Sequence, residues 1–168
     1  MSSTVPCPPF DPELDAILAM LADQIPTVTA ETIDELRAAP LPGIPTDEEL
    51  AAASVSRREI TIPGYEGADL IATVLARTDK TDVGPGIYHV HGGGMIAGNR
   101  MVGIGQILPW IIEHSAVAVT VEYRLAPEFP DPYPVEDSYA GLVWMAEHAS
   151  DLGIDLDRLI IAGASAGG

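Results

Sequence analysis

The last ten residues of the chain constrain its fold more than any other stretch. A short apolar run, Leu159 to Ala162, leads directly into Gly163-Ala164-Ser165-Ala166-Gly167. This Gly-x-Ser-x-Gly pattern predicts a buried strand that turns sharply at Ser165, with a helix beginning just after it. The two glycines leave room for the turn, because a side chain at either position would crowd the backbone or the neighbouring strand. Taken by itself, the stretch has an alternative interpretation as a tight turn without chemistry.

A second glycine-rich turn follows an earlier predicted strand. Residues 86–91 read as that strand, and Gly92-Gly93-Gly94-Met95 come directly after it. Consecutive glycines let the backbone approach a ligand and aim N–H groups at it. One preorganised donor aimed at a developing oxyanion typically lowers a barrier by about 3–4 kcal/mol. A phosphate loop is disfavoured, because no Gly-Lys-Ser/Thr follows and the next basic residue is Arg100. A flexible loop is the remaining alternative.

Three stretches together resemble the hormone-sensitive-lipase-like carboxylesterases, also called bacterial family IV esterases, of the α/β-hydrolase superfamily. These stretches are His91-Gly92-Gly93-Gly94, Glu122-Tyr123-Arg124-Leu125-Ala126-Pro127-Glu128 and Gly163-Ala164-Ser165-Ala166-Gly167-Gly168. The resemblance extends from about Ser56 to the end of the chain, and more loosely over the first 50 residues. One departure is Ala164, where many members carry Asp, which puts a supporting contact behind the serine in doubt.

The resemblance implies a role for each residue of these motifs. Ser165 is the expected nucleophile, and the N–H groups of Gly93, Gly94 and Ala166 are the expected oxyanion hole. The supporting residues that it implies are His91, Gly92, Tyr123, Arg124, Glu128, Gly163 and Gly167. Residues 123–128 are expected to brace the floor of the active site. Without the resemblance, the same residues read as a tight turn in which Arg124 pairs with Glu128.

The order of the predicted elements favours an α/β-hydrolase fold, with a mostly parallel sheet, an antiparallel N-terminal edge and helices on both faces. Ser56 to Pro63 and Asp69 to Arg77 read as a hairpin around a glycine-containing turn. Strands near 86–91, 116–121 and 159–162 then alternate with helices. This βαβαβ order implies parallel strands with right-handed crossovers. Pro109 lies inside the first of these helices and predicts a kink or a late start.

Residues 1–45 are predicted to form a helical segment of their own, and residues 46–168 the N-terminal part of the hydrolase domain. Asp11-Pro12 begins one helix, a second runs from about Ala30 to Ala38, and a connector rich in proline follows. Thr46-x-x-Glu49 predicts a capping box on the next helix. In the resembled family the N-terminal segment forms part of a cap over the active site. Plain packing on the main domain is the alternative.

A serine hydroxyl needs a base, which is usually a histidine oriented by a carboxylate. In α/β-hydrolases both follow the serine in the chain, whereas this sequence ends three residues after Ser165. We therefore expect that the sequence is the N-terminal part of a longer polypeptide, truncated just after the turn at Ser165. The C-terminal remainder is expected to supply the Asp and His. An intact mass of only 17.7 kDa would contradict this expectation.

The resulting expectation is a serine carboxylesterase that hydrolyses short-chain or aryl esters through an acyl-enzyme on Ser165. Its partner is a small-molecule ester, the resemblance implies no cofactor, and family members often pair through a late strand, which makes a homodimer one expected state. The alternative is a non-catalytic member that binds a small ligand. Plant gibberellin receptors resemble the family in this way, because they keep the serine but lack a working histidine. A dead homologue that only binds its neighbours is a third interpretation.

Charge and composition argue against several other classes. The chain has 8 basic and 25 acidic residues and a formal charge of −17, which disfavours nucleic acid and anionic membranes as partners. No apolar run reaches the roughly 20 residues of a membrane span. The single cysteine, Cys7, and the absence of a signal sequence favour a cytoplasmic location. His89 and His91 form a conceivable metal pair, but no further ligand follows at suitable spacing, so we expect no metal.

Overall fold

The computed structural model describes residues 8–21, 28–41 and 43–168, and it divides into two compact units, Met1–Leu36 and Arg37–Gly168. Cys7, which was used above as an indication of location, lies outside the described residues. Helix α1 (Pro12–Leu21) starts as predicted, with the Asp11 carboxylate accepting a hydrogen bond from Glu13 N at 2.9 Å. Helix α2 (Ile33–Ala38) spans the division between the units. The predicted boundary after residue 45 and the role of a cap stay predictions.

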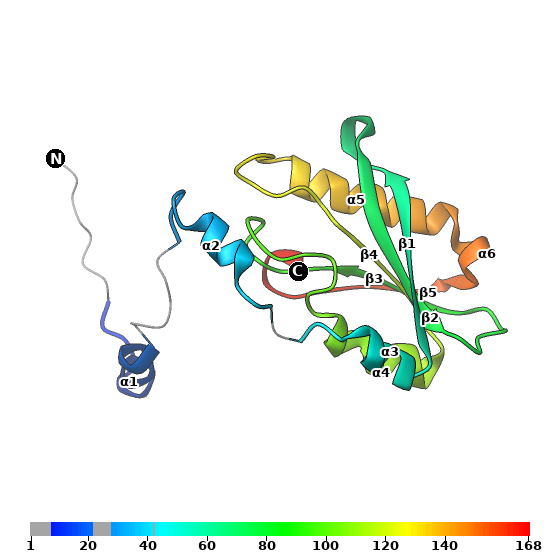
Figure 1. Ribbon diagram of the computed structural model, residues 1–168, viewed down its shortest axis with the longest axis horizontal. Helices are drawn as coiled ribbons and strands as arrows, with labels where there is room; N and C mark the ends of the chain where they lie inside the picture. The colour runs from blue at the N-terminus through cyan, green and yellow to red at the C-terminus, as the bar shows by residue number, and fades with distance from the viewer. Residues whose placement is uncertain (1–7, 22–27, 42) are drawn as a thin grey trace. The chain divides into compact units, whose positions relative to one another are not determined.

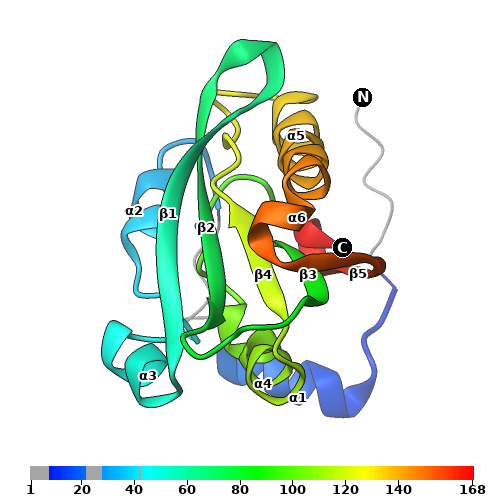
Figure 2. The ribbon, with the colours of Figure 1, turned by 90° about the vertical axis from the view of Figure 1, so that its right-hand side faces the viewer.

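The second unit is built on a mixed sheet (Figures 1 and 2). Its strands are β1 (Val55–Pro63), β2 (Asp69–Arg77), β3 (Gly84–Val90), β4 (Val117–Val121) and β5 (Ile154–Gly163). Across the described residues the strand order is β1-β2-β4-β3-β5. The β1–β2 hairpin is antiparallel and β2 is antiparallel to β4, whereas β4, β3 and β5 run parallel. The predicted parallel set with an antiparallel N-terminal edge is therefore confirmed.

Helices cover both faces of this sheet, as predicted. Figure 1 shows α5 (Tyr133–Glu147) on one side of the strands and α3 (Asp47–Ala52) with α4 (Ile104–His114) on the other. The short helix α6 (Ala149–Leu152) follows α5 and leads into β5. Neighbouring residues of one strand enter opposite cores: Ile87 packs in the cluster with Ile104, and Tyr88 in the cluster with Met145. This alternation explains why the central strands carry few polar residues.

Two local predictions have definite outcomes. The capping box is confirmed, because Glu49 N donates to Thr46 Oγ1 at 3.1 Å and Thr46 N donates to the Glu49 carboxylate at 2.8 Å. Helix α4 begins at Ile104 and includes Pro109, so the predicted late start is wrong, whereas the kink stays a prediction. Proline has no N–H, so one hydrogen bond of the helix is missing at that point. The apolar face of α4 compensates, since Ile104, Ile107 and Ile111 are all buried.

Candidate active site

Ser165 lies on a sharp turn directly after β5. Its backbone is left-handed, with a φ of 57°, which a residue with a side chain rarely adopts. A single 3₁₀ turn, Ser165–Gly167, follows at the place where the sequence predicts the start of a helix. Backbone strain of this kind is found preferentially at active sites. The structure therefore has the strained corner that the Gly-x-Ser-x-Gly pattern predicts, and the serine is exposed there.

The glycines on either side of the serine are needed for steric reasons. A Cβ atom on Gly163 would overlap the carbonyl oxygen of Gly167, and a Cβ on Gly167 would overlap that of Val90. No side-chain movement can relieve either clash, because the obstructing atoms belong to the backbone. The predicted reason for both glycines is thereby confirmed.

The glycine loop, residues 91–100, meets this turn because β3 and β5 are parallel neighbours. Val90 is in register with Gly163, so the segments that leave the two strands emerge at the same edge of the sheet. A Cβ on Gly92 would stand 2.7 Å from Ala164 O and 3.5 Å from Ser165 Cβ. Gly93 has a φ of 127°, and its carbonyl accepts hydrogen bonds from Ile96 N and Ala97 N at 3.2 and 3.0 Å. Two motifs that lie far apart in the sequence are thus in contact.

A cavity of about 370 Å³ opens where they meet. Gly92, Gly93 and Ser165 line this cavity together with His89 and Gln106. The other predicted oxyanion residues differ from Gly93 in this respect. Ala166 lines a neighbouring cavity of about 260 Å³ with Tyr123 and Gly167, whereas Gly94 lines neither. The N–H of Ala166 nevertheless belongs to the peptide unit that it shares with Ser165.

His91 and Tyr123 brace the start of the glycine loop. Their rings stack with centroids 4.1 Å apart, and Tyr123 Oη donates to the carbonyl oxygen of His91 at 2.7 Å. His91 Nδ1 carries its proton, because it donates to Gly92 O at 2.8 Å and a carbonyl can only accept. Burial lowers the pKa of His91, which favours the neutral ring. Its Nε2 is buried and has no hydrogen-bond partner within the described residues. His91 is thus fixed as part of the loop.

Arg124 does not pair with Glu128, so that interpretation of the turn is wrong. Arg124 instead pairs with Asp137, whose carboxylate accepts from Arg124 Nε at 2.7 Å and from Nη2 at 2.8 Å. The same carboxylate accepts from the backbone N of Arg124 and of Tyr65, each at 3.1 Å. Asp137 is fully buried, on the inward face of α5 that it shares with Gly141. Asp137 lies four residues before Gly141, which is one helical turn, so the sequence could have placed it on the buried face of the helix.

Glu128 pairs with Arg37, a residue for which the sequence predicted no role. Arg37 Nη1 and Nη2 each donate to the Glu128 carboxylate at 2.8 Å. Hydrogen bonding to Arg37 lowers the pKa of Glu128 to about 2. The same guanidinium donates to Ile96 O in the glycine loop and to Ala126 O in the turn, also at 2.8 Å. Arg37 therefore joins the loop to the turn, and no local pattern marks it for that role.

Neither a metal site nor a membrane span was found in the part of the chain that the structure describes. No group of three His, Cys, Asp or Glu side chains there could hold a metal ion. His89 is buried, and its Nδ1 lies 3.4 Å from Thr120 Oγ1. Burial lowers the pKa of His89 to about 4. Among the described helices, none is both long and apolar enough to cross a bilayer.

Residues 87–168 match the model of a family described as having the α/β hydrolase fold. Carboxylesterase NlhH of Mycobacterium tuberculosis is 36% identical over 159 residues, a match that covers 94% of this chain and 49% of that protein. Hormone-sensitive lipase of Bos taurus is 34% identical over 82 residues, which are 49% of this chain and 11% of the lipase. A solved structure, "Bacterial Heroin Esterase", superposes with a TM-score of 0.69 at 33% identity and covers 94% of this chain and 49% of that one. The chain spans about half the length of the first of these relatives.

Proposed function

Since this chain belongs to the hormone-sensitive-lipase-like family of the α/β-hydrolase fold, we propose that it carries the nucleophile and the oxyanion hole of a serine carboxylesterase. The names of its relatives support ester hydrolysis as the reaction. One observation carries the proposal for this chain: Ser165, on a strained turn, and Gly92-Gly93 line the same cavity. A nucleophile beside backbone N–H donors is the arrangement that acyl transfer requires.

In the proposed reaction, Ser165 Oγ attacks the carbonyl carbon of the ester. The N–H groups of Gly93, Gly94 and Ala166 stabilise the oxyanion that forms on the carbonyl oxygen. The bond to the alkoxy group then breaks, and the serine proton reaches the departing alcohol through a base. Water hydrolyses the acyl-enzyme and regenerates the serine hydroxyl. Short-chain and aryl esters are the proposed substrates.

The base and the carboxylate that orients it are proposed to come from polypeptide beyond Gly168. His91 is a poor candidate for the base, because its ring is buried and stacked on Tyr123. His89 is also buried, and its low pKa disfavours proton uptake near neutral pH. Both residues are therefore assigned structural roles. We also propose that the protein is cytoplasmic, that it uses no cofactor and that a homodimer is one of its states.

The supporting residues act by holding the loop and the turn in place. Tyr123 fixes the carbonyl of His91 at the start of the glycine loop. Arg124 ties the turn that follows β4 to Asp137 in α5. Glu128 holds Arg37, which in turn contacts the glycine loop at Ile96 O. Such supports keep reacting groups in their productive geometry, and a displacement of about 1 Å can lower a rate about 100-fold.

A fluorophosphonate probe tests the proposal, because it reacts only with an activated serine. The complete polypeptide should become labelled at Ser165, as located by peptide mass spectrometry, and it should hydrolyse p-nitrophenyl esters. The Ser165→Ala variant should lose labelling and nearly all turnover, leaving at most the roughly 10³–10⁴-fold acceleration that remains when a triad is disabled. Full turnover in this variant, or a wild-type protein that is neither labelled nor active, would refute the assignment. The second result would favour the non-catalytic, ligand-binding alternative.

A further inference from the structure

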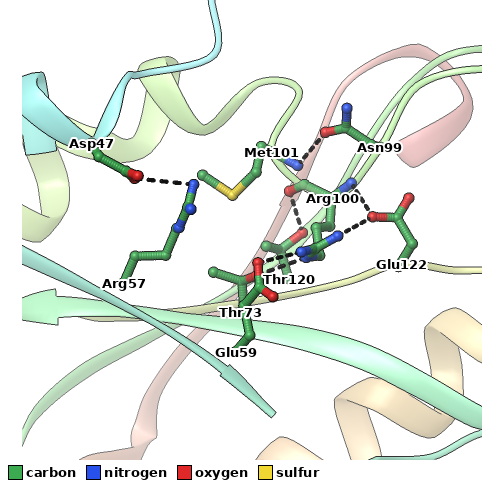
Figure 3. Close-up of polar contacts among 9 residues, drawn as sticks. All are labelled: Asp47, Arg57, Glu59, Thr73, Asn99, Arg100, Met101, Thr120 and Glu122. Carbon is green, nitrogen blue, oxygen red and sulfur yellow. Dashed lines mark hydrogen bonds and ion pairs between the residues drawn. The ribbon is translucent and has the colours of Figure 1, made fainter. Parts of the chain in front are cut away.

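Arg100 ends the glycine loop, and its side chain reaches three strands of the sheet (Figure 3). The guanidinium donates a hydrogen bond to a residue on, or directly after, each strand. The partners are Thr73 Oγ1 on β2 at 2.8 Å, Glu122 Oε2 just after β4 at 2.6 Å, and the carboxylate of Glu59 on β1. One side chain thus joins the loop to β1, β2 and the end of β4.

The main chain of Arg100 is held at the same place. Its N–H donates to Glu122 Oε2 at 3.3 Å, and its carbonyl accepts from Thr120 Oγ1 at 2.9 Å (Figure 3). The arginine side chain is only 18% exposed, and Thr73 and Thr120 are fully buried. Hydrogen bonds with charged partners are stronger than neutral ones, and partial burial shields these from water. Arg100 is therefore a fixed point on the sheet.

This fixed point is close to the candidate active site. Gly98 precedes Arg100 by two residues and packs directly on the start of the loop. A Cβ on Gly98 would stand 2.6 Å from Gly92 O and 2.8 Å from His91 Nδ1. A shift of the Arg100 end would therefore change the contact of Gly98 with Gly92, the residue immediately before Gly93.

A second set of contacts connects Arg100 with the candidate active site through residues of the sheet. Thr120 Oγ1, which donates to Arg100 O, lies 3.4 Å from Nδ1 of His89. The His89 side chain lines the cavity of about 370 Å³ together with Ser165. Arg100 is thus connected with that cavity in two ways: along the glycine loop, and through Thr120 on β4 and His89 on β3.

We propose that Arg100 is a positioning residue for the oxyanion hole: it anchors the outgoing end of the glycine loop to the sheet and keeps the Gly93 and Gly94 amides aimed at the carbonyl oxygen of the ester. The role rests on the proposed esterase function. Arginine suits it because its planar fork donates in several directions at once and keeps its charge. A lysine has a single nitrogen at this end and cannot reach Thr73, Glu59 and Glu122 together.

The test uses the complete polypeptide with Arg100→Met, Arg100→Lys and the matched control Arg57→Met. Arg57 lies on β1 and forms its ion pair with Asp47 on α3 at 3.2 Å (Figure 3), so the control removes the same charge from the same region. For p-nitrophenyl ester hydrolysis, Arg100→Met should lower kcat about 10- to 100-fold, the range expected for a misplaced catalytic group, with KM changed by no more than about twofold. Arg100→Lys should be intermediate, and Arg57→Met should match the wild type.

A trifluoromethyl ketone provides a readout that a purely structural role would not change. It adds to the catalytic serine and places an oxyanion in the hole, so Arg100→Met should weaken its affinity by the same factor as kcat/KM. Unchanged kcat and ketone affinity in a folded Arg100→Met protein would overturn the proposal. A rise in KM at constant kcat would also overturn it, because that pattern reports uniform binding.

Milder variants keep the proposal testable if Arg100→Met does not fold. Thr73→Val and Glu122→Gln each weaken one contact of the guanidinium, and each should lower kcat several-fold with KM unchanged. Unchanged kcat in both would overturn the proposal. The fluorophosphonate probe separates this result from failure of the esterase assignment. A labelled wild type whose Arg100 variants keep full kcat refutes the positioning role alone, whereas an unlabelled wild type refutes both.

Discussion

The guanidinium of Arg124 and the fully buried carboxylate of Asp137 form a two-point ion pair, with N–O distances of 2.7 and 2.8 Å. This pair ties the turn after β4 to the inward face of α5. The carboxylate also accepts a backbone hydrogen bond from Tyr65 at 3.1 Å, in the turn of the N-terminal hairpin. One buried charge therefore organises three segments close to the motif residues that follow β4.

Removal of that charge should destabilise the fold strongly. Asp137→Ala removes the carboxylate partner of Arg124 and the acceptor of two backbone N–H groups, and breaking a buried pair in this way costs about 3–5 kcal/mol. Urea unfolding followed by circular dichroism measures the loss. The exposed Asp151→Ala on α6 is the control and should change stability by less than about 0.5 kcal/mol. A similar small change in Asp137→Ala would show that the pair contributes little.

A methyl group at Gly92 should impair catalysis more than stability. Its Cβ would stand 2.7 Å from Ala164 O, so the glycine loop must move away from the turn at Ser165. We expect kcat to fall at least about 10-fold, as for other small displacements of catalytic groups. Gly67→Ala is the control, because Gly67 has a φ of 75° but open space around it. That control should lose about 1 kcal/mol of stability from backbone strain and keep its kcat. Equal kcat values for the two variants would contradict a contact between the glycine loop and the turn at Ser165.

The pair between Glu128 and Arg37 should contribute to acid sensitivity. Hydrogen bonding to Arg37 lowers the pKa of Glu128 from 4.5 to about 2, so the folded state binds this proton less readily than the unfolded state. The stabilisation is present above the unfolded value and is lost as the pH falls from about 4.5 towards 2. Melting temperatures of the wild type and Glu128→Gln should therefore converge over that interval. A constant difference down to pH 2 would argue against a charged pair.

Protonation of His89 should lower the stability of the fold in a neighbouring pH range. Burial lowers its pKa from 6.5 to about 4, so between these values the unfolded state binds the proton and the folded state does not. Stability should therefore fall as the pH decreases from about 6.5 to 4, and His89→Gln should show a shallower decline. NMR titration of the imidazole carbon signals locates the folded value directly. A midpoint near 6.5 would show that the ring is not shielded from water.

Local patterns in the sequence predicted the elements that depend on neighbouring residues. The hairpin of β1 and β2 follows from alternation around a glycine-containing turn, and the capping box follows from Thr46 and Glu49. The turn at Ser165 follows from two glycines whose Cβ atoms would overlap backbone oxygens. Each of these conformations is decided within a few residues, because steric exclusion and short-range hydrogen bonds act over that distance.

The partners of the charged residues could not be predicted in the same way. Arg124 pairs with Asp137 and not with Glu128, and Glu128 pairs with Arg37, which is 91 positions away in the chain. Arg100 contacts Glu59, 41 positions away. Any of several carboxylates could satisfy the charge of each arginine, so only the tertiary arrangement of the elements selects the pairs.

The sequence by itself determined that this chain makes a glycine loop and a strained serine turn at the ends of two strands, since both rest on residues that few other conformations tolerate. The tertiary structure decided that these two turns meet. It brought them together by making β3 and β5 parallel neighbours, with Val90 in register with Gly163. It also decided which arginines hold the loop there, because an ion pair needs charges within a few ångströms and places no demand on their separation along the chain.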